Sequence, residues 1–459
     1  MKAKMHQKKG LGNKTMEGQK KTLQTLTLGC SKNKVDTEHI LPYANTLYEI
    51  VPEGATDRYV DILLINTCGF IGDAKEESVN AILESVERKK AGQVGQIIVF
   101  GCLAQRYAAE LPKLIPEVDK WLGARDSDAV IKAIGGVPDR RMETERHLTS
   151  ASHYAYLKIS EGCDRRCSYC AIPFIRGAHK SVPIEVLVRE AEKLAAKGVR
   201  ELIVIAQDTT YYGLDLYHRR ALAELLEKLS EVEGIEWIRI HYSYPASFPE
   251  NVLELMADNP KICRYMDIPL QHISDKVLDM MHRNVDGAWT RELIRKMREK
   301  VPGVVLRTTM IVGHPGEGVK EFNELLDFVR QARIERLGAF KYSEEEGTYG
   351  AENFHDSIPD ATKQKRLDRL MSIQSEISLE FNQSRIGTEE KVIVDDYSDG
   401  VYVCRSEFES PEVDGEILVR YDKDVMQNVE PYSLIGEFIK VKITGADEYD
   451  LIAEPIELL

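Results

Sequence analysis

The chain has 459 residues, of which 43% are apolar and 30% are charged, and this composition is typical of a globular protein with about three domains. No apolar run approaches the ~18 residues that a membrane-spanning helix needs, and the N-terminus lacks the apolar core and cleavage site of a signal peptide. Eight cysteines spread over the whole length argue against a secreted disulfide framework and favour thiolate ligands in a reducing compartment. We therefore expect a cytoplasmic protein that binds no membrane.

Charge is distributed unevenly along the chain. Residues 1–21 carry seven lysines against one acid, Glu17, and we predict that they form a disordered basic extension. The net charge of the chain is −14, and residues 385–459 alone hold 7 Lys/Arg against 19 Asp/Glu, or −12. Nearly all of the acidity therefore belongs to the C-terminal part.

Short β-rich runs alternate with helical stretches in residues 22–137, which indicates a small parallel α/β sheet. Strands are predicted at residues 22–28, 60–66 and 96–100. Each of these strands is followed by a cysteine, namely Cys30, Cys68 or Cys102. Because the carboxyl ends of parallel strands share one edge of a sheet, we expect the three thiols to converge there. The alternative is three unrelated buried thiols.

A polar segment, residues 138–152, is the predicted linker to a second α/β region, residues 153–358. Six strands are predicted there, at residues 156–160, 201–207, 237–243, 265–269, 304–312 and 337–342. Six β/α units would form an open (βα)6 partial TIM barrel, with the active site at the carboxyl ends of its strands.

A cysteine loop follows the first of these six strands, with Cys163, Cys167 and Cys170 in the spacing C-x3-C-x2-C. Three thiolates can bind three irons of a [4Fe–4S] cubane, where full ligation takes four cysteines, so the fourth iron is left open for a substrate. A structural zinc site is the alternative, but such sites usually use two separated ligand pairs and fill all four positions.

The C-terminal part begins with a predicted connecting helix, residues 359–385. Residues 386–459 then alternate short apolar runs with Gly/Asp turns. Strands are predicted at residues 391–395, 401–405, 416–421, 437–444 and 450–457. This pattern is typical of a small all-β barrel.

Motifs in all three parts resemble those of one family, the radical-SAM methylthiotransferases, from about residue 22 to the C-terminus. The motifs are Leu28-Gly29-Cys30-Ser31-Lys32-Asn33, Asn66-Thr67-Cys68-Gly69-Phe70, the C-x3-C-x2-C loop with Tyr169 before its last cysteine, and Ser410-Pro411-Glu412-Val413-Asp414-Gly415, which is similar to a TRAM-domain signature. The resemblance implies two [4Fe–4S] clusters. One, at Cys163, Cys167 and Cys170, chelates S-adenosylmethionine (SAM) and cleaves it to a 5′-deoxyadenosyl radical. The other, at Cys30, Cys68 and Cys102, delivers sulfur.

The same resemblance points to SAM-binding residues at strand ends. We predict that these are Gln207, Asp208, Arg307, Thr308 and Pro315. Two departures from the family pattern accompany them: Ala206-Gln207-Asp208 replaces the usual Gly-Gly-Glu, and His314 replaces an apolar residue before Pro315. His314 and His272 could lie in the pocket or serve as structural residues.

For the substrate, the sequence is similar to the branch that methylthiolates the β-carbon of an aspartate in small-subunit ribosomal protein twelve. Ser31-Lys32-Asn33 and Ala206-Gln207-Asp208-Thr209-Thr210 carry this similarity. An acidic barrel would attract a basic ribosomal protein and argues against direct tRNA binding, which needs cations for the phosphates. We expect Glu407, Glu409 and Glu412 to be exposed on that surface. The electron donor would be a flavodoxin or ferredoxin.

Two other functions stay open from the sequence. Methylthiolation of a tRNA adenosine uses the same chemistry. It would need a positively charged barrel that can bind phosphates, whereas this barrel is negative. A non-enzymatic iron–sulfur protein for electron transfer would need full cysteine ligation, whereas both triplets stop at three cysteines.

Overall fold

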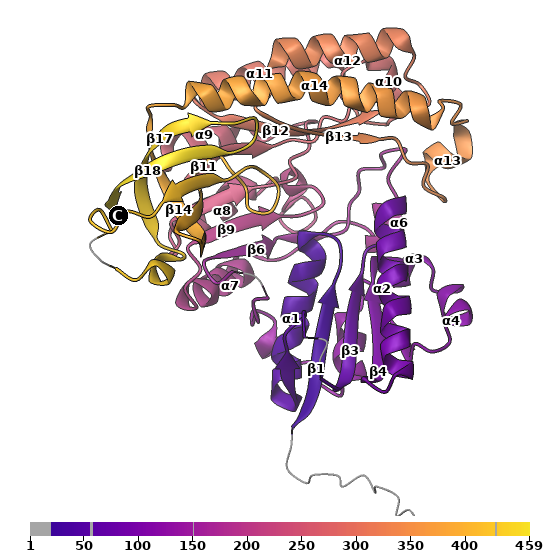
Figure 1. Cartoon of the computed structure of the whole chain (residues 1–459). Helices are drawn as coiled ribbons and strands as arrows, with labels where there is room; N and C mark the ends of the chain where they lie inside the picture. Colours follow the sequence, from indigo (N-terminus) through magenta and orange to yellow (C-terminus); the bar gives the residue numbers. More distant parts are fainter. Residues whose placement is uncertain (1–19, 56–57, 150, 427–428) are drawn as a thin grey trace, which may run out of the picture.

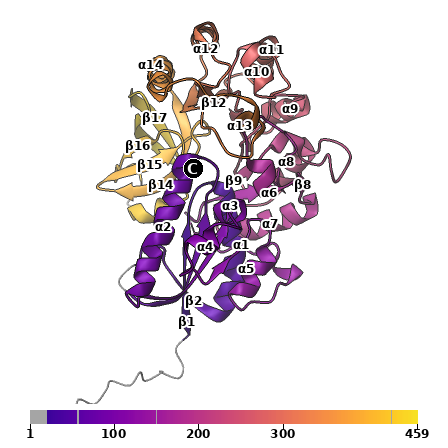
Figure 2. The ribbon, with the colours of Figure 1, turned by 90° about the vertical axis from the view of Figure 1, so that its right-hand side faces the viewer.

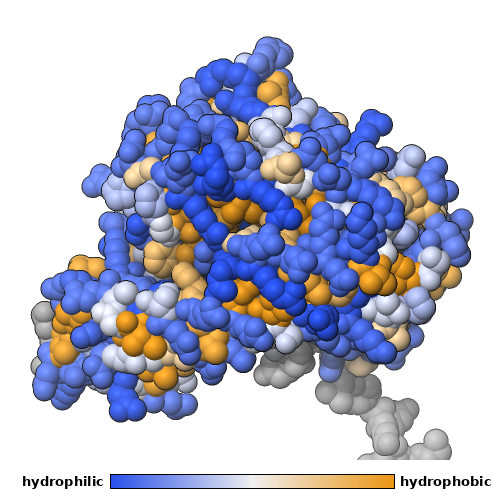
Figure 3. Space-filling model, turned by 90° about the horizontal axis from the view of Figure 1, so that it is seen from above, coloured by the Kyte–Doolittle hydropathy of each residue, from blue (hydrophilic) through white to orange (hydrophobic). Residues whose placement is uncertain are grey.

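The computed structural model describes residues 20–55, 58–149, 151–426 and 429–459, and the predicted basic extension lies outside the described residues except for Lys20 and Lys21. An N-terminal domain lies below a central domain in two perpendicular views, and a C-terminal barrel packs beside the central domain (Figures 1 and 2). Hydrophilic residues cover most of the face seen from above, with apolar residues in small groups between them (Figure 3). None of the described helices is both long and apolar enough to cross a membrane.

The N-terminal domain is a five-stranded parallel sheet in the order β2-β1-β3-β4-β5. Its strands are β1 (Lys21–Thr27), β2 (Tyr48–Val51), β3 (Val60–Thr67), β4 (Val94–Gly101) and β5 (Lys120–Trp121). Its helices are α1 (Ser31–Leu47), α2 (Gly72–Lys90), α3 (Cys102–Arg106), α4 (Leu111–Leu114) and α5 (Ser127–Ala133). The predicted parallel sheet is confirmed, and the two strands that sequence patterns missed, β2 and β5, are the shortest.

The central domain contains a six-stranded parallel sheet in the order β13-β12-β11-β10-β9-β6. The strands are β6 (Tyr154–Lys158), β9 (Glu201–Ile205), β10 (Trp237–Ile240), β11 (Ile262–Asp267), β12 (Val305–Val312) and β13 (Arg336–Lys341), with a hairpin of β7 (Ser160–Glu161) and β8 (Lys180–Ser181). Around them lie α6 (Ile172–Arg176), α7 (Ile184–Ala196), α8 (Leu222–Ser230), α9 (Glu250–Asp258), α10 (Asp275–Met280), α11 (Gly287–Lys300), α12 (Val319–Ala332) and α13 (Tyr349–Asn353). All six predicted strands are present, and the sheet stays open as expected.

The two faces of this sheet differ in chemistry. Side chains such as Leu202, Ile240 and Leu306 pack on the surrounding helices in one apolar core. Because successive strand residues point to opposite faces, their neighbours turn to the inside of the partial barrel. Those inner residues include Glu201, Arg239, Asp267 and Arg307, which bind one another or the C-terminal barrel. The inside of the partial barrel therefore holds charged residues beside buried hydrophobic ones such as Ile203 and Tyr265.

The C-terminal segment forms the predicted connecting helix and a closed five-stranded barrel in the order β14-β15-β16-β18-β17. The elements are α14 (Asp360–Ser384), β14 (Glu389–Ser398), β15 (Val401–Arg405), β16 (Ile417–Arg420), β17 (Phe438–Ala446) and β18 (Leu451–Leu458). Three short 3-10 helices complete the described elements: Arg140–Met142, Thr209–Tyr211 and Pro431–Leu434.

Acidic residues of the barrel bind the other domains, which overturns one expectation. Glu409 is 1% exposed and accepts hydrogen bonds from Arg336 (2.9 Å) and Arg385. Glu407 pairs with Arg264 at 2.7 Å. Glu412 is 44% exposed but pairs with Lys34 at 2.6 Å. The prediction that these three glutamates are exposed is confirmed for Glu412 but wrong for Glu409, which is buried, and Glu407 is only partly exposed. All three are paired with basic residues that are distant in the sequence, so local patterns could not show these pairs.

The predicted linker is fixed by a buried cation. Arg146 is 2% exposed and donates to Glu38 of α1 and to Glu190 of α7, the latter at 2.7 Å. Burial would raise the pKa of Glu190, but the positive charges of His39 and Arg146 lower it to about 2. One guanidinium thus ties the N-terminal domain to the central domain.

We expect Arg146→Met to destabilise the protein by about 3–5 kcal/mol, because two buried carboxylates lose their cation. The melting temperature should fall clearly in a thermal scan, while Arg141→Met, at a residue that is 90% exposed, should change it little.

Since the folded pKa of Glu190 lies below the unfolded value of about 4.5, its ion pair stabilises the protein fully above that pH. The difference between wild type and Arg146→Met should therefore shrink as the pH falls from about 4.5 toward 2. Equal melting temperatures at neutral pH would contradict this account.

Candidate metal centre and cofactor cavity

The first cysteine triplet lies in the loop between β7 and α6, at the carboxyl end of β6. The loop is tight: the amide of Cys163 donates to the Gly177 carbonyl at 3.0 Å, and Gly162 has a φ of +76°. A Cβ on Gly162 would lie 2.1 Å from the Ala178 carbonyl oxygen, so only glycine fits there. Burial raises the pKa of the Cys163 thiol to about 12 and that of Cys170 above its ordinary value, so iron binding must displace these protons.

Two side chains from distant segments accompany Cys167. The guanidinium of Arg283 lies 3.6 Å from its Sγ, and the Tyr244 hydroxyl lies 3.9 Å from it. Arg283 is buried and stacks over the Tyr244 ring at 4.2 Å. A buried cation beside thiolates stabilises their negative charge, as ligation of iron requires. Sequence patterns did not reveal either residue, because no local pattern marks a partner more than 70 positions away.

The second triplet lies at the carboxyl ends of β1, β3 and β4, where the fold brings the three cysteines together. A Cβ on Gly29, the neighbour of Cys30, would lie 2.9 Å from Cys68 Sγ, and one on Gly69 would lie 2.7 Å from the amide nitrogen of Leu103, the neighbour of Cys102. Cys30 is also the N-cap of α1, next to the free amide groups of the first helical turn. Among the described residues, no three Cys, His, Asp or Glu side chains are arranged to bind a single metal ion. A cubane does not need that arrangement, because each thiolate binds a different iron.

Arg176, at the end of α6, connects the two triplets. Its Nε donates to Cys102 Sγ at 3.2 Å and its Nη2 to Asn33 Oδ1 at 2.6 Å, both in the N-terminal domain. Its Nη1 donates to Asp36 at 2.7 Å and to Glu161, beside the first triplet, at 3.1 Å. The side chain is almost completely buried. Although Arg176 lies only six residues after Cys170, its partners could not be identified from the sequence.

Several buried polar atoms near the first triplet have no hydrogen-bond partner in the described part of the chain. Among the described residues, Ser160 Oγ, Arg165 Nη2, Ser168 Oγ and Gln207 Oε1 are buried without a hydrogen-bond partner. Buried polar atoms without partners are rare and call for a water or ligand. Donors and acceptors next to three thiols at strand ends fit a polar cofactor that binds at an open iron, such as SAM.

The predicted SAM residues lie at these strand ends, with different freedom to bind a ligand. Gln207 is partly free, since its Nε2 donates to Glu161 and its Oε1 has no partner in the described residues. Asp208 is buried and accepts from Arg165 Nε at 2.8 Å. Arg307 pairs with Asp267 at 3.1 Å and lies 3.6 Å from Asp414 of the C-terminal barrel. The Thr308 hydroxyl donates to the Ile268 carbonyl at 2.8 Å.

The turn after β12 contains Pro315, which is half-buried, and His314, which is fully buried. Burial lowers the pKa of His314 to about 4, and its ring contacts Tyr342 edge-on at 5.0 Å. His272 is also buried and lies 3.1 Å from Glu317. His272 and Glu317 thus hold the turn together. All five SAM contacts stay predictions.

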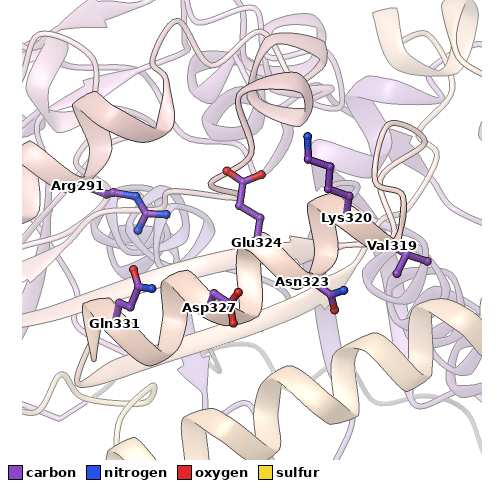
Figure 4. Close-up of a pocket in the computed structure, with 7 residues that line it drawn as sticks. All are labelled: Arg291, Val319, Lys320, Asn323, Glu324, Asp327 and Gln331. Atoms are coloured by element: carbon purple, nitrogen blue, oxygen red, sulfur yellow. The ribbon is translucent and has the colours of Figure 1, made fainter.

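Two cavities have no cysteine in their lining. A groove of about 670 Å³ on the outer surface is lined by mostly polar side chains of α12, with Val319, and by Arg291 of α11 (Figure 4). It touches no strand end and no cysteine. A larger cavity of about 870 Å³ lies between the N-terminal and central domains, on the side of Arg176 that faces Asp36, Lys158 and Glu161.

Comparisons with known proteins agree with this architecture. Residues 22–123 match the model of the uncharacterized protein family UPF0004, residues 157–329 the radical SAM superfamily and residues 386–456 the TRAM domain. Two ribosomal protein uS12 methylthiotransferases called RimO are similar over nearly their whole length. The protein of Phocaeicola vulgatus is 50% identical, over 94% of this chain and 98% of its own length. The protein of Bacteroides thetaiotaomicron is 48% identical, over 95% of this chain and 98% of its own length.

A solved structure shares the fold. The radical S-adenosylmethionine methyltransferase TsrM from Kitasatospora setae, with cobalamin and a [4Fe–4S] cluster bound, has a TM-score of 0.52 and 15% identity over 72% of this chain and 77% of its own. Together, the three domains and the relatives define a radical-SAM methylthiotransferase, an enzyme that uses SAM and iron–sulfur chemistry. Within that class, the chain belongs to the RimO family of ribosomal protein uS12 methylthiotransferases.

We expect Gln207→Leu to weaken SAM binding about tenfold, since it removes a buried acceptor that the cofactor can use. Thr308→Val is the comparison, because the Thr308 hydroxyl is already bound to the Ile268 carbonyl and the Leu270 amide, so any contact of Thr308 with SAM would use its backbone and should survive this change. Equilibrium titration of the reconstituted protein with SAM measures both affinities. Unchanged affinity in Gln207→Leu at normal iron content would remove this residue from the site.

Proposed function

We propose that this chain attaches a methylthio group to the β-carbon of an aspartate in uS12, with one [4Fe–4S] cluster at each cysteine triplet. The proposal rests on the contacts of Arg176, whose single side chain binds Cys102 of the second triplet and Glu161 beside the first triplet. Two metal centres joined in this way can serve one substrate. The RimO relatives support uS12 as that substrate.

The chain's own residues would position and shield the chemistry. Hydrogen abstraction from an unactivated carbon is beyond side-chain acids and bases, so the bound cluster and SAM supply that step. Cys163, Cys167 and Cys170 would hold the radical-forming cluster, with Arg283 offsetting its negative charge. Cys30, Cys68 and Cys102 would hold the sulfur-delivering cluster, with Arg176 in the corresponding role.

SAM would lie against the unpartnered polar atoms around Gln207. Arg165 and Asp208, bound to each other at 2.8 Å, would form a rigid wall beside the cofactor. The electron donor, a flavodoxin or ferredoxin, stays a prediction.

Charge on the barrel still favours a basic protein over tRNA, though through other residues than predicted. Acids that are exposed on the barrel and take part in no ion pair among the described residues are Asp396, Asp399, Glu416, Asp422, Asp424, Glu430, Asp447, Glu448, Asp450 and Glu454. These outnumber the exposed cations Lys391, Arg420, Lys423 and Lys442. The outer face of the barrel is therefore negative and would repel a phosphate backbone.

In cells that lack this chain, we expect the methylthio mass to disappear from uS12 and to stay unchanged on tRNA. Wild-type chain should restore it, whereas the variant with Cys30, Cys68 and Cys102 replaced by Ala should not. Mass spectrometry of both fractions measures the outcome. A methylthio group lost from tRNA instead would overturn the choice of substrate.

Anaerobic reconstitution should give about eight irons per chain from two cubanes, and replacing Cys163, Cys167 and Cys170 by Ala should leave about four. The remaining iron should disappear when Cys30, Cys68 and Cys102 are replaced as well. Iron analysis and visible absorption measure both steps. A wild type that never exceeds about four irons would contradict the two-cluster proposal.

We expect Arg176→Met to impair the second cluster selectively, since it removes the donor to Cys102. The variant is best placed in the chain whose first triplet is alanine, so that all bound iron reports on the second triplet. Arg166→Met is the matched control, because Arg166 is an exposed arginine in the loop that precedes α6. Equal iron and equal spectra in both variants would show that Arg176 serves only domain docking.

A further inference from the structure

Lys32, on the first turn of α1 and two residues after Cys30, is a buried cation without a carboxylate partner. Its side chain is 8% exposed, and its Nζ lies 2.9 Å from the centroid of the Tyr242 ring. Within the described residues it forms no ion pair. The neighbouring cations do: Lys34 binds Glu412, Lys158 binds Asp36 and Glu161, and Arg176 binds Asp36 and Glu161.

The ring beneath Lys32 is held in place by the central domain. Tyr242 follows β10, at the carboxyl end of the sheet, and its backbone has a φ of +59°, which is uncommon for a non-glycine residue. Its amide donates to Asp267 at 2.9 Å, and its carbonyl accepts from the Thr209 amide at 3.1 Å. Lys32 therefore lies where the edge of the second triplet meets the strand ends of the partial barrel.

The environment favours an anion beside Lys32. Burial of an ammonium group is costly unless it is paired, and a cation–π contact offsets only part of that cost. Asn33, the next residue, is bound to Arg176 and to the Leu28 carbonyl, so the start of α1 is rigid and keeps the ammonium in place. A cation held in this way is preorganised for a ligand carboxylate.

We propose that Lys32 binds the side-chain carboxylate of the target aspartate. This inference rests on the proposed function and deepens it. The carboxylate is bonded to the β-carbon that receives sulfur, so one ion pair would place that carbon next to the second triplet. Lys32 is then a specificity-determining residue that selects a carboxylate over an amide.

A double-mutant cycle tests the pairing directly. The reconstituted enzyme, with SAM present, is titrated with uS12 that carries its target aspartate and with uS12 that carries asparagine there. Wild type should bind the aspartate form at least about tenfold more tightly. Lys32→Met should lose this preference, and Lys32→Arg, which retains the charge, should keep part of it.

Lys34→Met is the matched control. It removes the same charge from the same helix, but from a lysine already neutralised by Glu412 at 2.6 Å, so the preference for aspartate should persist. Iron content and visible spectra of each variant show that the clusters are present.

The outcomes separate this inference from the proposed function. A wild type that prefers the aspartate form, together with an equal preference in Lys32→Met, overturns the role of Lys32 alone. A wild type that binds neither form and modifies no uS12 overturns the proposed function and this inference with it.

Discussion

The guanidinium of Arg176 is the contact on which the arrangement of the two cysteine triplets depends. It donates hydrogen bonds to the Cys102 thiol and the Asn33 side-chain amide of the N-terminal domain. It also donates to two carboxylates at the junction of the domains, Asp36 and Glu161. Because arginine presents its donors in a rigid planar fork, all four partners are fixed relative to one another. A lysine could supply the charge at this position but not the geometry.

Buried ion pairs also join the other domains. Glu201, on the inside of the partial barrel, is fully buried between Arg239 of the same sheet and Arg405 of the C-terminal barrel, at 2.8 Å from each. Such pairs contribute little net stability, because desolvation offsets most of the attraction, but an unpaired member would be very costly. They therefore select one docking geometry for the barrel. Ion pairs of this kind also bury carboxylates, such as that of Glu409, that would otherwise be exposed to solvent.

The pairing of charges around the strand ends has a consequence for catalysis. Arg307 is paired with Asp267, and Arg165 with Asp208. Gln207 Oε1 has no hydrogen-bond partner among the described residues, and Lys32 has no carboxylate partner there, so both groups can bind a ligand. The orphaned acceptor lies near the first triplet and the cation near the second. A cofactor and a substrate approaching from these two sides would meet between the triplets.

The sequence by itself determined the three parts of the fold, the six strands of the central sheet and the grouping of six cysteines into two triplets. These features depend on local alternation, turn residues and short spacings, which are properties of neighbouring positions. The two-residue strand β5 could not be predicted from such patterns, because it is too short to show a period.

Only the tertiary structure decided which charged residues meet. Arg176 and Asp36 are 140 residues apart, and Glu409 lies 73 residues from Arg336. Whether a glutamate is a surface charge or a buried partner, and whether a lysine is neutralised or free for a substrate, depends on such distant neighbours. Electrostatic interactions act through space rather than along the chain, so no local pattern could have revealed them.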